Sequence, residues 1–429
     1  MKKLLLLLLL LTALVSLFSC AAQPVVTTSA ENSESVALTT ALPPTAEPTV
    51  SSTKPTAEKP PVTKIGITLE DKPLSAYTIV YADSLYSPSV LEVFSTEHDF
   101  FKLIAEDIKA RIAEKTGTVL SVVRDSESDP TMYEILVGPT NREESDALDT
   151  MDVFKTCVKL VGTKLVVGAG YVSTPYTGNK RESYCYASTY HAWDSVERAL
   201  VERMAAGIDS FTFDANTDFS TKVDLITVAC IGDSITEGAG STARDFHAYP
   251  AVLGRILWQD YLIVNLGNSG KTMRDDLASH YRGTVSHAAM RRYARMYDYA
   301  LLMLGTNDSY YDRSWPASSD EKYLSSAERL VEELTFNNDR VEVVVMNCPM
   351  YYGTSGSGSE KVRTLQALLP SRFEAMGVKS RFFDMYTFTK EEVGKANFPD
   401  QLHPNDRGHI LMAEKLSTLL RAWEDESKS

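Results

Sequence analysis

The amino-acid sequence predicts an α/β protein with two folded parts, of which the second is built on a parallel, doubly wound sheet. One observation is length, because 429 residues are enough for two or three domains. The other is that strand-like and helix-like segments alternate from Asp224 to Trp423. Such alternation requires crossover connections, which produce a parallel sheet with helices on both faces. The part before Asp224 alternates less regularly and predicts a smaller α+β domain.

Composition excludes some classes of partner. The chain is 44% hydrophobic and 23% charged, as in ordinary globular proteins. Its formal net charge of −14 argues against non-specific binding to nucleic acid or to an anionic lipid surface. A neutral sugar or ester substrate is compatible with this charge.

Residues 1–20 predict an export signal rather than part of the fold. A basic pair, Lys2-Lys3, precedes an apolar run from Leu4 to Leu17. The end of that run, Leu17-Phe18-Ser19-Cys20, resembles the signal of bacterial lipoproteins. The resemblance implies that Cys20 carries lipid and anchors the protein to the outer face of a bacterial membrane, its only expected membrane contact. The alternative is a soluble secreted protein whose Cys20 is discarded with the signal.

Residues 21–70 are assigned to a disordered tether. From Ala21 to about Pro61 the segment is rich in Thr, Ser, Ala and Pro and has no aromatic residue. Such a composition cannot bury enough apolar surface to offset the entropy of ordering. After a lipid-bearing Cys20, this segment would lift the folded part away from the membrane.

Residues 71–222 predict an accessory α+β domain without a catalytic cluster. The expected strands are Tyr77–Ala82, Val119–Val123, Tyr133–Val137, Thr156–Val161, Lys164–Val167 and Ser210–Phe213, and the expected helices are Asp99–Lys115 and Tyr190–Ala206. Three segments, Glu114–Gly117, Glu134–Glu143 and Gly162–Gly170, resemble the small non-catalytic domain that precedes the catalytic barrel of some glycoside hydrolases. The resemblance implies a fold and no activity.

Residues 223–423 predict the catalytic domain. The expected strands are Leu225–Ile231, Leu262–Leu266, Tyr299–Leu304, Val341–Met346 and Ser380–Asp384. The expected helices are Ala248–Trp258, Arg274–Tyr281, Val285–Met296, Ser319–Leu334, Ser359–Met376 and Asn405–Trp423. Right-handed crossovers would place the loops that follow the strands along one edge of the sheet.

Residues suited to acyl transfer occupy loops at this predicted edge. Ser234 follows the first strand directly and is a weak nucleophile until a base removes its proton. His403 can be that base, since imidazole titrates near neutral pH. Asp400, three residues earlier in the same turn, can accept the other ring N–H and stabilise the imidazolium. The simpler interpretation of Gly232-Asp233-Ser234 alone is a turn.

An oxyanion formed during acyl transfer requires preorganised hydrogen-bond donors. The backbone N–H groups of Ser234 and Gly270 and the side-chain amide of Asn307 can converge on it. Gly270 suits this role because a residue without Cβ lets the backbone approach a substrate closely.

These loops together resemble the SGNH (GDSL) hydrolase family. The matching blocks, in order, are Gly232-Asp233-Ser234 with Gly238, Gly270, Gly305-Thr306-Asn307-Asp308 and Asp400-Gln401-Leu402-His403-Pro404. The resemblance implies a flavodoxin-like three-layer α/β/α fold, ester hydrolysis and no cofactor. It covers about Asp224 to Trp423.

The substrate expected from the sequence is an acetylated polysaccharide. Aromatic residues after the third and fourth strands could stack on sugar rings, and the expected substrate rim consists of Asp233, Tyr310, Trp315 and Tyr351, joined by Tyr311 and Tyr352. The alternatives are a lipase, lysophospholipase or thioesterase of the same family, and a glycan-binding surface protein without activity. The sequence leaves open the particular ester and the oligomeric state.

Other reactive residues are expected to be structural. Cys230 and Cys348 end buried strands, and Cys157 with Cys185 is the one pair for which a disulfide deserves a test. His247, His280, His287 and His409 are expected to be surface or packing residues. No Cys or His spacing predicts a metal site.

Overall fold

The computed structural model describes residues 62–83, 100–149, 151–170, 186–312, 314–353 and 357–428. The expected signal and its Cys20, most of the expected tether and Cys185 lie outside these ranges. Cys157, Cys230 and Cys348 are buried free cysteines.

The second half of the chain forms a five-stranded sheet. Its strands are β10 (Ile226–Gly232), β11 (Tyr261–Gly267), β12 (Tyr299–Met303), β13 (Glu342–Met346) and β14 (Ser380–Phe383). They lie in the order β11-β10-β12-β13-β14, and every neighbouring pair is parallel. This is the flavodoxin-like order of a doubly wound sheet, so the predicted fold class is confirmed.

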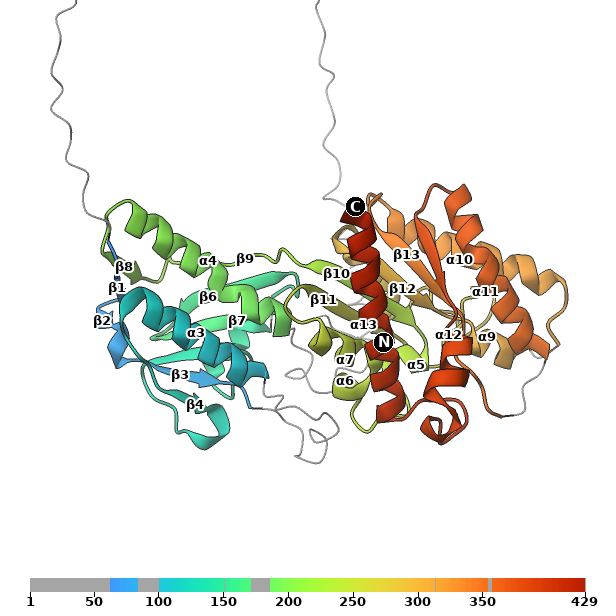
Figure 1. The fold of residues 1–429 in the computed structure, drawn as a ribbon, viewed down its shortest axis with the longest axis horizontal. Helices are drawn as coiled ribbons and strands as arrows, with labels where there is room; N and C mark the ends of the chain where they lie inside the picture. The colour runs from blue at the N-terminus through green and yellow to red at the C-terminus, as the bar shows by residue number, and fades with distance from the viewer. Residues whose placement is uncertain are drawn as a thin grey trace, which may run out of the picture. The chain divides into compact units, whose positions relative to one another are not determined.

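Helices cover both faces of this sheet (Figure 1). The longer ones are α7 (Tyr249–Ile256), α8 (Val285–Arg292), α10 (Ser318–Thr335), α11 (Ser357–Ala375) and α13 (Asp406–Lys428). The short helices α5 (Ser234–Glu237), α9 (Thr306–Tyr311) and α12 (Met385–Phe388) follow individual strands, and α6 (Arg244–His247) lies between α5 and α7. Helices α7 and α13 pack on one face, while α8, α10 and α11 pack on the other.

The central strand β10 shows why the sheet is buried on both sides. Val228 and Cys230 belong to the core beneath α7 and α13, whereas Ala229 and Ile231 belong to the core beneath α8 and α10. Side chains of a strand alternate between its faces, so a strand covered on both faces must be continuously apolar. This is the pattern from which the strand was predicted.

One predicted helix of this domain, Arg274–Tyr281, is wrong, because the segment is a loop. The backbone N–H groups of Met273 and Arg274 donate to the Asp308 carboxylate, which holds the start of the segment. Thr272 also exchanges backbone hydrogen bonds with Ser279 and Tyr281. Tertiary partners therefore replace the hydrogen bonds that a helix would form.

Residues 66–222 contain two further sheets. A six-stranded sheet has the order β4-β3-β5-β7-β6-β9, with strands β3 (Thr78–Tyr81), β4 (Val122–Arg124), β5 (Glu134–Val137), β6 (Lys155–Val161), β7 (Lys164–Ala169) and β9 (Thr221–Lys222). A three-stranded sheet has the order β2-β1-β8, with β1 (Gly66–Leu69), β2 (Lys72–Pro73) and β8 (Ser210–Phe213). Helices α3 (Phe100–Thr116) and α4 (Tyr186–Ala205) accompany these sheets.

The ordered chain begins earlier than the sequence suggested. Strand β1 lies within the segment assigned to the tether, and it pairs with β8 in parallel. Ile65, Ile67 and Leu69 alternate along it and are buried. Three apolar side chains with period two are enough to dock this short strand, although the composition around them is that of a linker.

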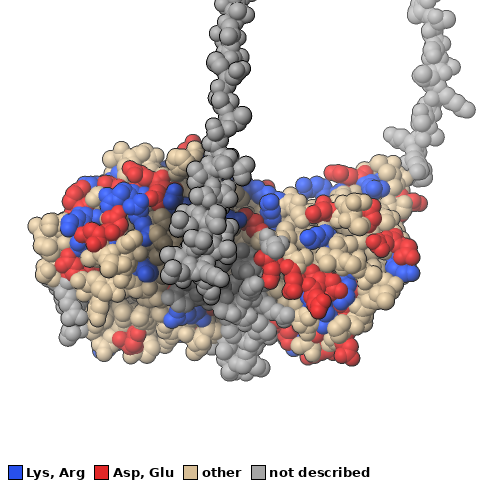
Figure 2. Space-filling model, turned by 180° about the vertical axis from the view of Figure 1, so that it is seen from behind, with Lys and Arg blue, Asp and Glu red and all other residues tan. Residues whose placement is uncertain are grey.

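Charges of both signs are interspersed on the face of the molecule seen in Figure 2. No helix within the described ranges is long and apolar enough to cross a membrane.

Candidate active site

Ser234 is held at the point where β10 turns into α5. The side chain of Asp233 caps this short helix by accepting the Ile235 N–H at 3.1 Å, and Gly238 ends it in the left-handed conformation with φ of +108°. Ser234 is 8% exposed. The nucleophile candidate therefore sits on a rigid turn with limited access to solvent.

The sheet brings three of the four predicted loops to one level. Gly232, the last residue of β10, pairs with Gly267 of β11 and with Met303 of β12. The residues that follow these positions therefore emerge side by side at the carboxyl edge of the sheet. They include Ser234, Gly270 and Asn307, as the sequence predicted.

The fourth loop places His403 against Ser234. Ser234 Oγ lies 3.0 Å from His403 Nε2, and His403 Nδ1 lies 2.6 Å from Asp400 Oδ2. A carboxylate at Nδ1 requires the N–H on that nitrogen, which leaves Nε2 as an acceptor for the serine proton. The geometry is that of a serine with a base and a carboxylate that orients the base.

Asp400 is fixed by its own turn. Its Oδ1 accepts the backbone N–H of Leu402 at 2.9 Å and that of His403 at 2.6 Å. Partial burial by itself raises the pKa of this carboxyl, but the hydrogen bonds from His403 and Leu402 outweigh that effect and lower the pKa below its usual value. Asp400 is therefore ionised across the neutral range.

The loop of residues 268–274, called here the Gly270 loop, is held by side chains from the short helices α5 and α9. Glu237 Oε2 accepts the Ser269 N–H at 2.6 Å. Asn307 Nδ2 donates to Lys271 O at 3.0 Å. Asp308 accepts the N–H groups of the last two loop residues at 2.8 and 2.9 Å. Gly270 itself has φ of +74°, with open space where a Cβ would lie.

Sequence reasoning missed Glu237 and the role of Asp308. Both side chains are almost entirely buried, with exposed fractions of 4% and 0%. The sequence did offer an indication, because Glu237 lies three residues after Ser234 and Asp308 directly follows Asn307.

Two buried carboxyls lie beneath Ser234. Asp233 and Asp308 are 1% and 0% exposed, and burial raises the pKa of each to about 6. Of the two carboxylate oxygens of Asp233, Oδ1 accepts the Ile235 N–H, whereas Oδ2 is buried without a hydrogen-bond partner. Asp233 therefore lies below the site, which corrects its expected place on the substrate rim.

The turn of His403 packs on the segment that follows α5. A Cβ at Gly240, whose φ is +91°, would lie 2.4 Å from Pro404 O and 2.9 Å from His403 Cβ. Thr242 donates its N–H and its hydroxyl to the two oxygens of Asp406, at 2.8 and 2.7 Å. The backbone around residue 240 therefore defines one wall of the histidine turn.

Two other histidines, His247 and His409, are structural. His247 and His409 are completely buried. His409 Nδ1 accepts the Tyr249 N–H, and burial lowers the pKa of His409 to about 4, so its ring is neutral. No group of three His, Cys, Asp or Glu residues within the described ranges is arranged to hold a metal ion.

The aromatic rim is smaller than expected. Trp315 is only 8% exposed: its Nε1 donates to Asp320 and its ring contacts Tyr323, so it belongs to the core. Tyr310 and Tyr311 are 61% and 51% exposed, and their rings pack edge to face at the end of α9, three and four residues after Asn307.

Two further tyrosines lie near the histidine turn. Tyr351 is partly buried. Tyr352 packs against Phe398, and its N–H donates to Gln401 O at 2.9 Å. Tyr352 thus supports the turn that carries Asp400 and His403.

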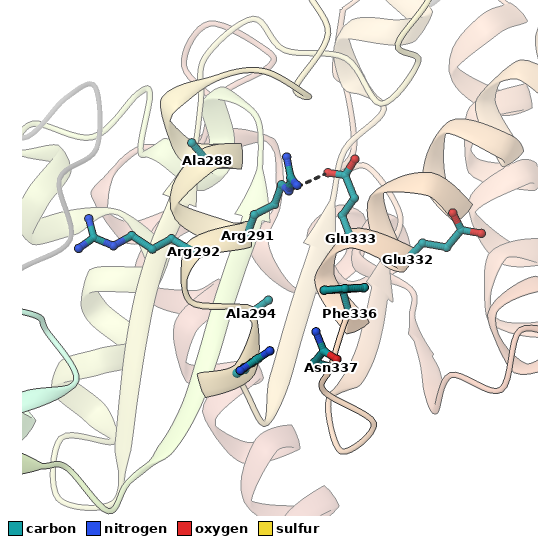
Figure 3. Close-up of a pocket in the computed structure, with 9 residues that line it drawn as sticks. Ala288, Arg291, Arg292, Ala294, Glu332, Glu333, Phe336 and Asn337 are labelled. Carbon is teal, nitrogen blue, oxygen red and sulfur yellow. Dashed lines mark ion pairs between the residues drawn. The ribbon is translucent and has the colours of Figure 1, made fainter. Parts of the chain in front are cut away.

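A separate groove of about 710 Å³ lies between α8 and α10 (Figure 3). Its lining includes Arg291, Glu333 and Phe336, and Figure 3 shows Arg291 and Glu333 directed toward each other. The groove adjoins the segments that precede β12 and β13, at the opposite end of the sheet from Ser234. It contains none of the candidate catalytic residues.

The doubly wound fold and the Ser234–His403–Asp400 hydrogen bonds define the arrangement found in serine hydrolases. Residues 230–411 match the GDSL-like Lipase/Acylhydrolase family. The family predicted from the sequence is thereby confirmed.

A curated relative is an acetylxylan esterase from Xylanibacter ruminicola, 29% identical over 273 residues. The match covers 58% of this chain and 54% of the relative, so the chain spans about half the length of that protein.

The solved structures that are similar to this chain have lower sequence identity than this relative. A family two carbohydrate esterase from Clostridium thermocellum, in complex with cellohexaose, is 19% identical; 50% of this chain and 70% of that chain are covered, with a TM-score of 0.35. A carbohydrate acetylesterase from Sinorhizobium meliloti is 18% identical; 46% and 99% of the two chains are covered, with a TM-score of 0.35. Similarity of this extent does not bear on the reaction.

Proposed function

We propose that the protein is a serine esterase that removes acetyl groups from carbohydrate. The observation that carries the proposal is the continuous path from Ser234 Oγ through His403 to Asp400, at 3.0 and 2.6 Å. The similarity to an acetylxylan esterase supports an acetylated polysaccharide as the substrate class.

In the proposed reaction Ser234 Oγ attacks the ester carbonyl while His403 Nε2 takes the hydroxyl proton. The oxyanion binds the N–H groups of Ser234 and Gly270 and the amide of Asn307. His403 then returns the proton to the sugar oxygen, which leaves with the electrons of the broken ester bond. Water, deprotonated by His403, attacks the acetyl-serine. The bond between Ser234 Oγ and the acetyl carbon then breaks, His403 returns the proton to Oγ, and acetate leaves.

Asn307 is suited to this role by its second amide hydrogen. One N–H is bound to Lys271 O, which orients the side chain. An amide nitrogen carries two hydrogens, so the other is available to an oxyanion. Tyr310 and Tyr311, exposed on the same helix, supply faces on which a sugar ring can stack.

The test compares hydrolysis of p-nitrophenyl acetate, butyrate, octanoate and palmitate, together with acetate release from acetylated xylan. We expect a steep preference for acetate that Ser234→Ala abolishes. A preference for octanoate or longer chains would replace the proposal by a lipase or thioesterase. Glycan binding without any Ser234-dependent hydrolysis would favour a non-catalytic surface protein.

We also propose that the protein is exported and held on the outer face of a bacterial membrane by lipid on Cys20. The motif that ends at this cysteine supports the proposal. Expression in a bacterial host followed by detergent phase separation tests it. The wild type should partition into the detergent phase, whereas Cys20→Ala should stay in the aqueous phase or remain unprocessed.

A further inference from the structure

Glu237 connects the nucleophile candidate to the Gly270 loop. It is the last residue of α5, the helix that begins with Ser234. Its Oε2 accepts the N–H of Ser269, the residue before Gly270, at 2.6 Å. A buried carboxylate that accepts a backbone N–H forms a charge-assisted bond, which is stronger than a neutral one.

The two segments are also packed backbone to backbone at this point. A Cβ at Gly267, where β11 ends, would lie 2.1 Å from Glu237 N and 2.6 Å from Glu237 Cα. The Gly270 loop therefore starts in direct contact with the residue whose side chain binds it. Movement of α5 and movement of the loop are coupled by both contacts.

On its far side the loop is held by Asp308 and Asn307, which follow β12. Glu237 supplies the near side. Without Glu237, the described hydrogen bonds to the loop from other side chains would all lie at or beyond Lys271. Only backbone hydrogen bonds, such as that from the Asn268 N–H to Gly232 O, would then restrain this side of the loop, and the N–H of Gly270 would have more freedom to rotate away from Ser234.

We propose that Glu237 is a positioning residue that fixes the Gly270 N–H as an oxyanion donor. This inference rests on the proposed esterase function. It assigns Glu237 no contact with the substrate, because its carboxylate is engaged by the loop and by Arg244.

The competing explanation is that Glu237 serves only the ion pair with Arg244. Arg244 comes from α6, and its side chain is 40% exposed, whereas that of Glu237 is 3% exposed. Mutants can distinguish the ion pair with Arg244 from the hydrogen bond with the Ser269 N–H. Arg244→Ala removes the ion pair but leaves the acceptor of the Ser269 N–H, and Glu237→Gln keeps an acceptor while removing the charge.

The experiment measures hydrogen exchange of the 268–272 amides and steady-state hydrolysis of p-nitrophenyl acetate on the full chain. In Glu237→Ala we expect faster exchange at these amides and a kcat lowered by up to about 10²-fold with little change in KM, because a displacement of about 1 Å has that effect. Glu237→Gln should recover part of the loss. Arg244→Ala should resemble the wild type in both measurements.

Unchanged exchange and unchanged kcat in a folded Glu237→Ala protein would overturn the inference. So would Arg244→Ala with the same losses as Glu237→Ala. If the wild type hydrolyses no ester, the proposed function fails, while the exchange measurement still decides whether Glu237 holds the loop.

Discussion

The side chain of Asp400 accepts three N–H groups from a single turn. Two come from the backbone of Leu402 and His403, and the third is His403 Nδ1–H. The imidazole is therefore fixed in orientation and tautomer before a substrate arrives. Preorganised polar groups need no rearrangement as charge develops, which is the main source of their catalytic effect.

Replacement of the Asn307 side chain should affect catalysis more than stability. We expect Asn307→Ala to lower kcat by roughly 10²–10³, as is typical for loss of one oxyanion donor. The matched control is Asn338→Ala, because Asn338 is a buried amide that donates to two backbone carbonyls far from Ser234. It should reduce the melting temperature and leave kcat near the wild-type value. Equal kcat losses in the two variants would remove Asn307 from the proposed role.

Asp233 should make stability depend on pH. Its pKa is raised from 3.8 to about 6, so the folded state keeps the proton to a higher pH than the unfolded chain does. The free energy of unfolding should therefore fall as pH rises from about 4 to 6, by up to about 3 kcal/mol from this group, at about 1.4 kcal/mol per pKa unit.

Denaturant unfolding of the wild type and Asp233→Asn between pH 4 and 8 measures this contribution. The variant lacks the charge, so its stability relative to the wild type should rise across that interval and then become constant. A difference independent of pH would show that the carboxyl is ionised throughout. Asp308, whose pKa is also about 6, contributes to both proteins and cancels in the comparison to first order.

At the scale of elements, the histidine turn is positioned by the backbone that follows α5. Gly240→Ala would push a Cβ against Pro404 O and His403 Cβ, at 2.4 and 2.9 Å. We expect kcat to fall by roughly 10²-fold, since a small displacement of a catalytic base is enough. Steady-state kinetics with p-nitrophenyl acetate measures the loss.

Gly377→Ala provides the matched control. Gly377 also has a positive φ, +80°, but open space surrounds its Cβ position. Both variants should lose about 1–2 kcal/mol of stability from the left-handed backbone. Only Gly240→Ala should lose activity, and a comparable loss in Gly377→Ala would mean that backbone strain alone is responsible.

At the scale of the whole molecule, a residue from the first half of the chain completes the core of the second. Phe154 is 3% exposed and packs on Tyr293 and Tyr297, with ring centroids 5.0 and 6.1 Å apart. Its carbonyl also accepts the N–H of Val223 at 2.9 Å. The catalytic sheet therefore depends on a side chain outside the segment that matches the family.

Truncation of Phe154 should consequently destabilise the part of the chain that carries Ser234. We expect Phe154→Ala to cost about 3–5 kcal/mol, the usual range for a buried phenylalanine. Phe336→Ala is the control, because Phe336 is 72% exposed and its loss should change stability by less than about 0.5 kcal/mol. The loss of Ser234-dependent activity on heating measures the thermal unfolding of each variant. Equal melting temperatures for Phe154→Ala and Phe336→Ala would show that the catalytic sheet does not depend on Phe154.

Patterns local in the chain were sufficient for much of the fold. Apolar runs predicted the strands β10, β11, β12 and β13, because a strand buried on both faces can contain little else. The segment 274–281 was mispredicted because its end residues bind partners outside it: the Arg274 N–H donates to the Asp308 carboxylate and the Tyr281 N–H to Thr272 O. No local pattern reveals such partners. Trp315 was misplaced for a related reason, since its partners Asp320 and Tyr323 come from the following helix.

The sequence by itself determined which residues could carry out acyl transfer, since the blocks around Ser234, Gly270, Asn307 and His403 are each visible as short motifs. Only the tertiary structure decided which side chains hold them in place. Glu237 and Asp308 were not predicted, because a buried carboxylate has the same local sequence signature as a solvated one. Parallel pairing of β10 with β11 and β12 brings Glu237 and Asp308 to the Gly270 loop. The strength of an electrostatic contact depends on distance in space and not on separation in the sequence.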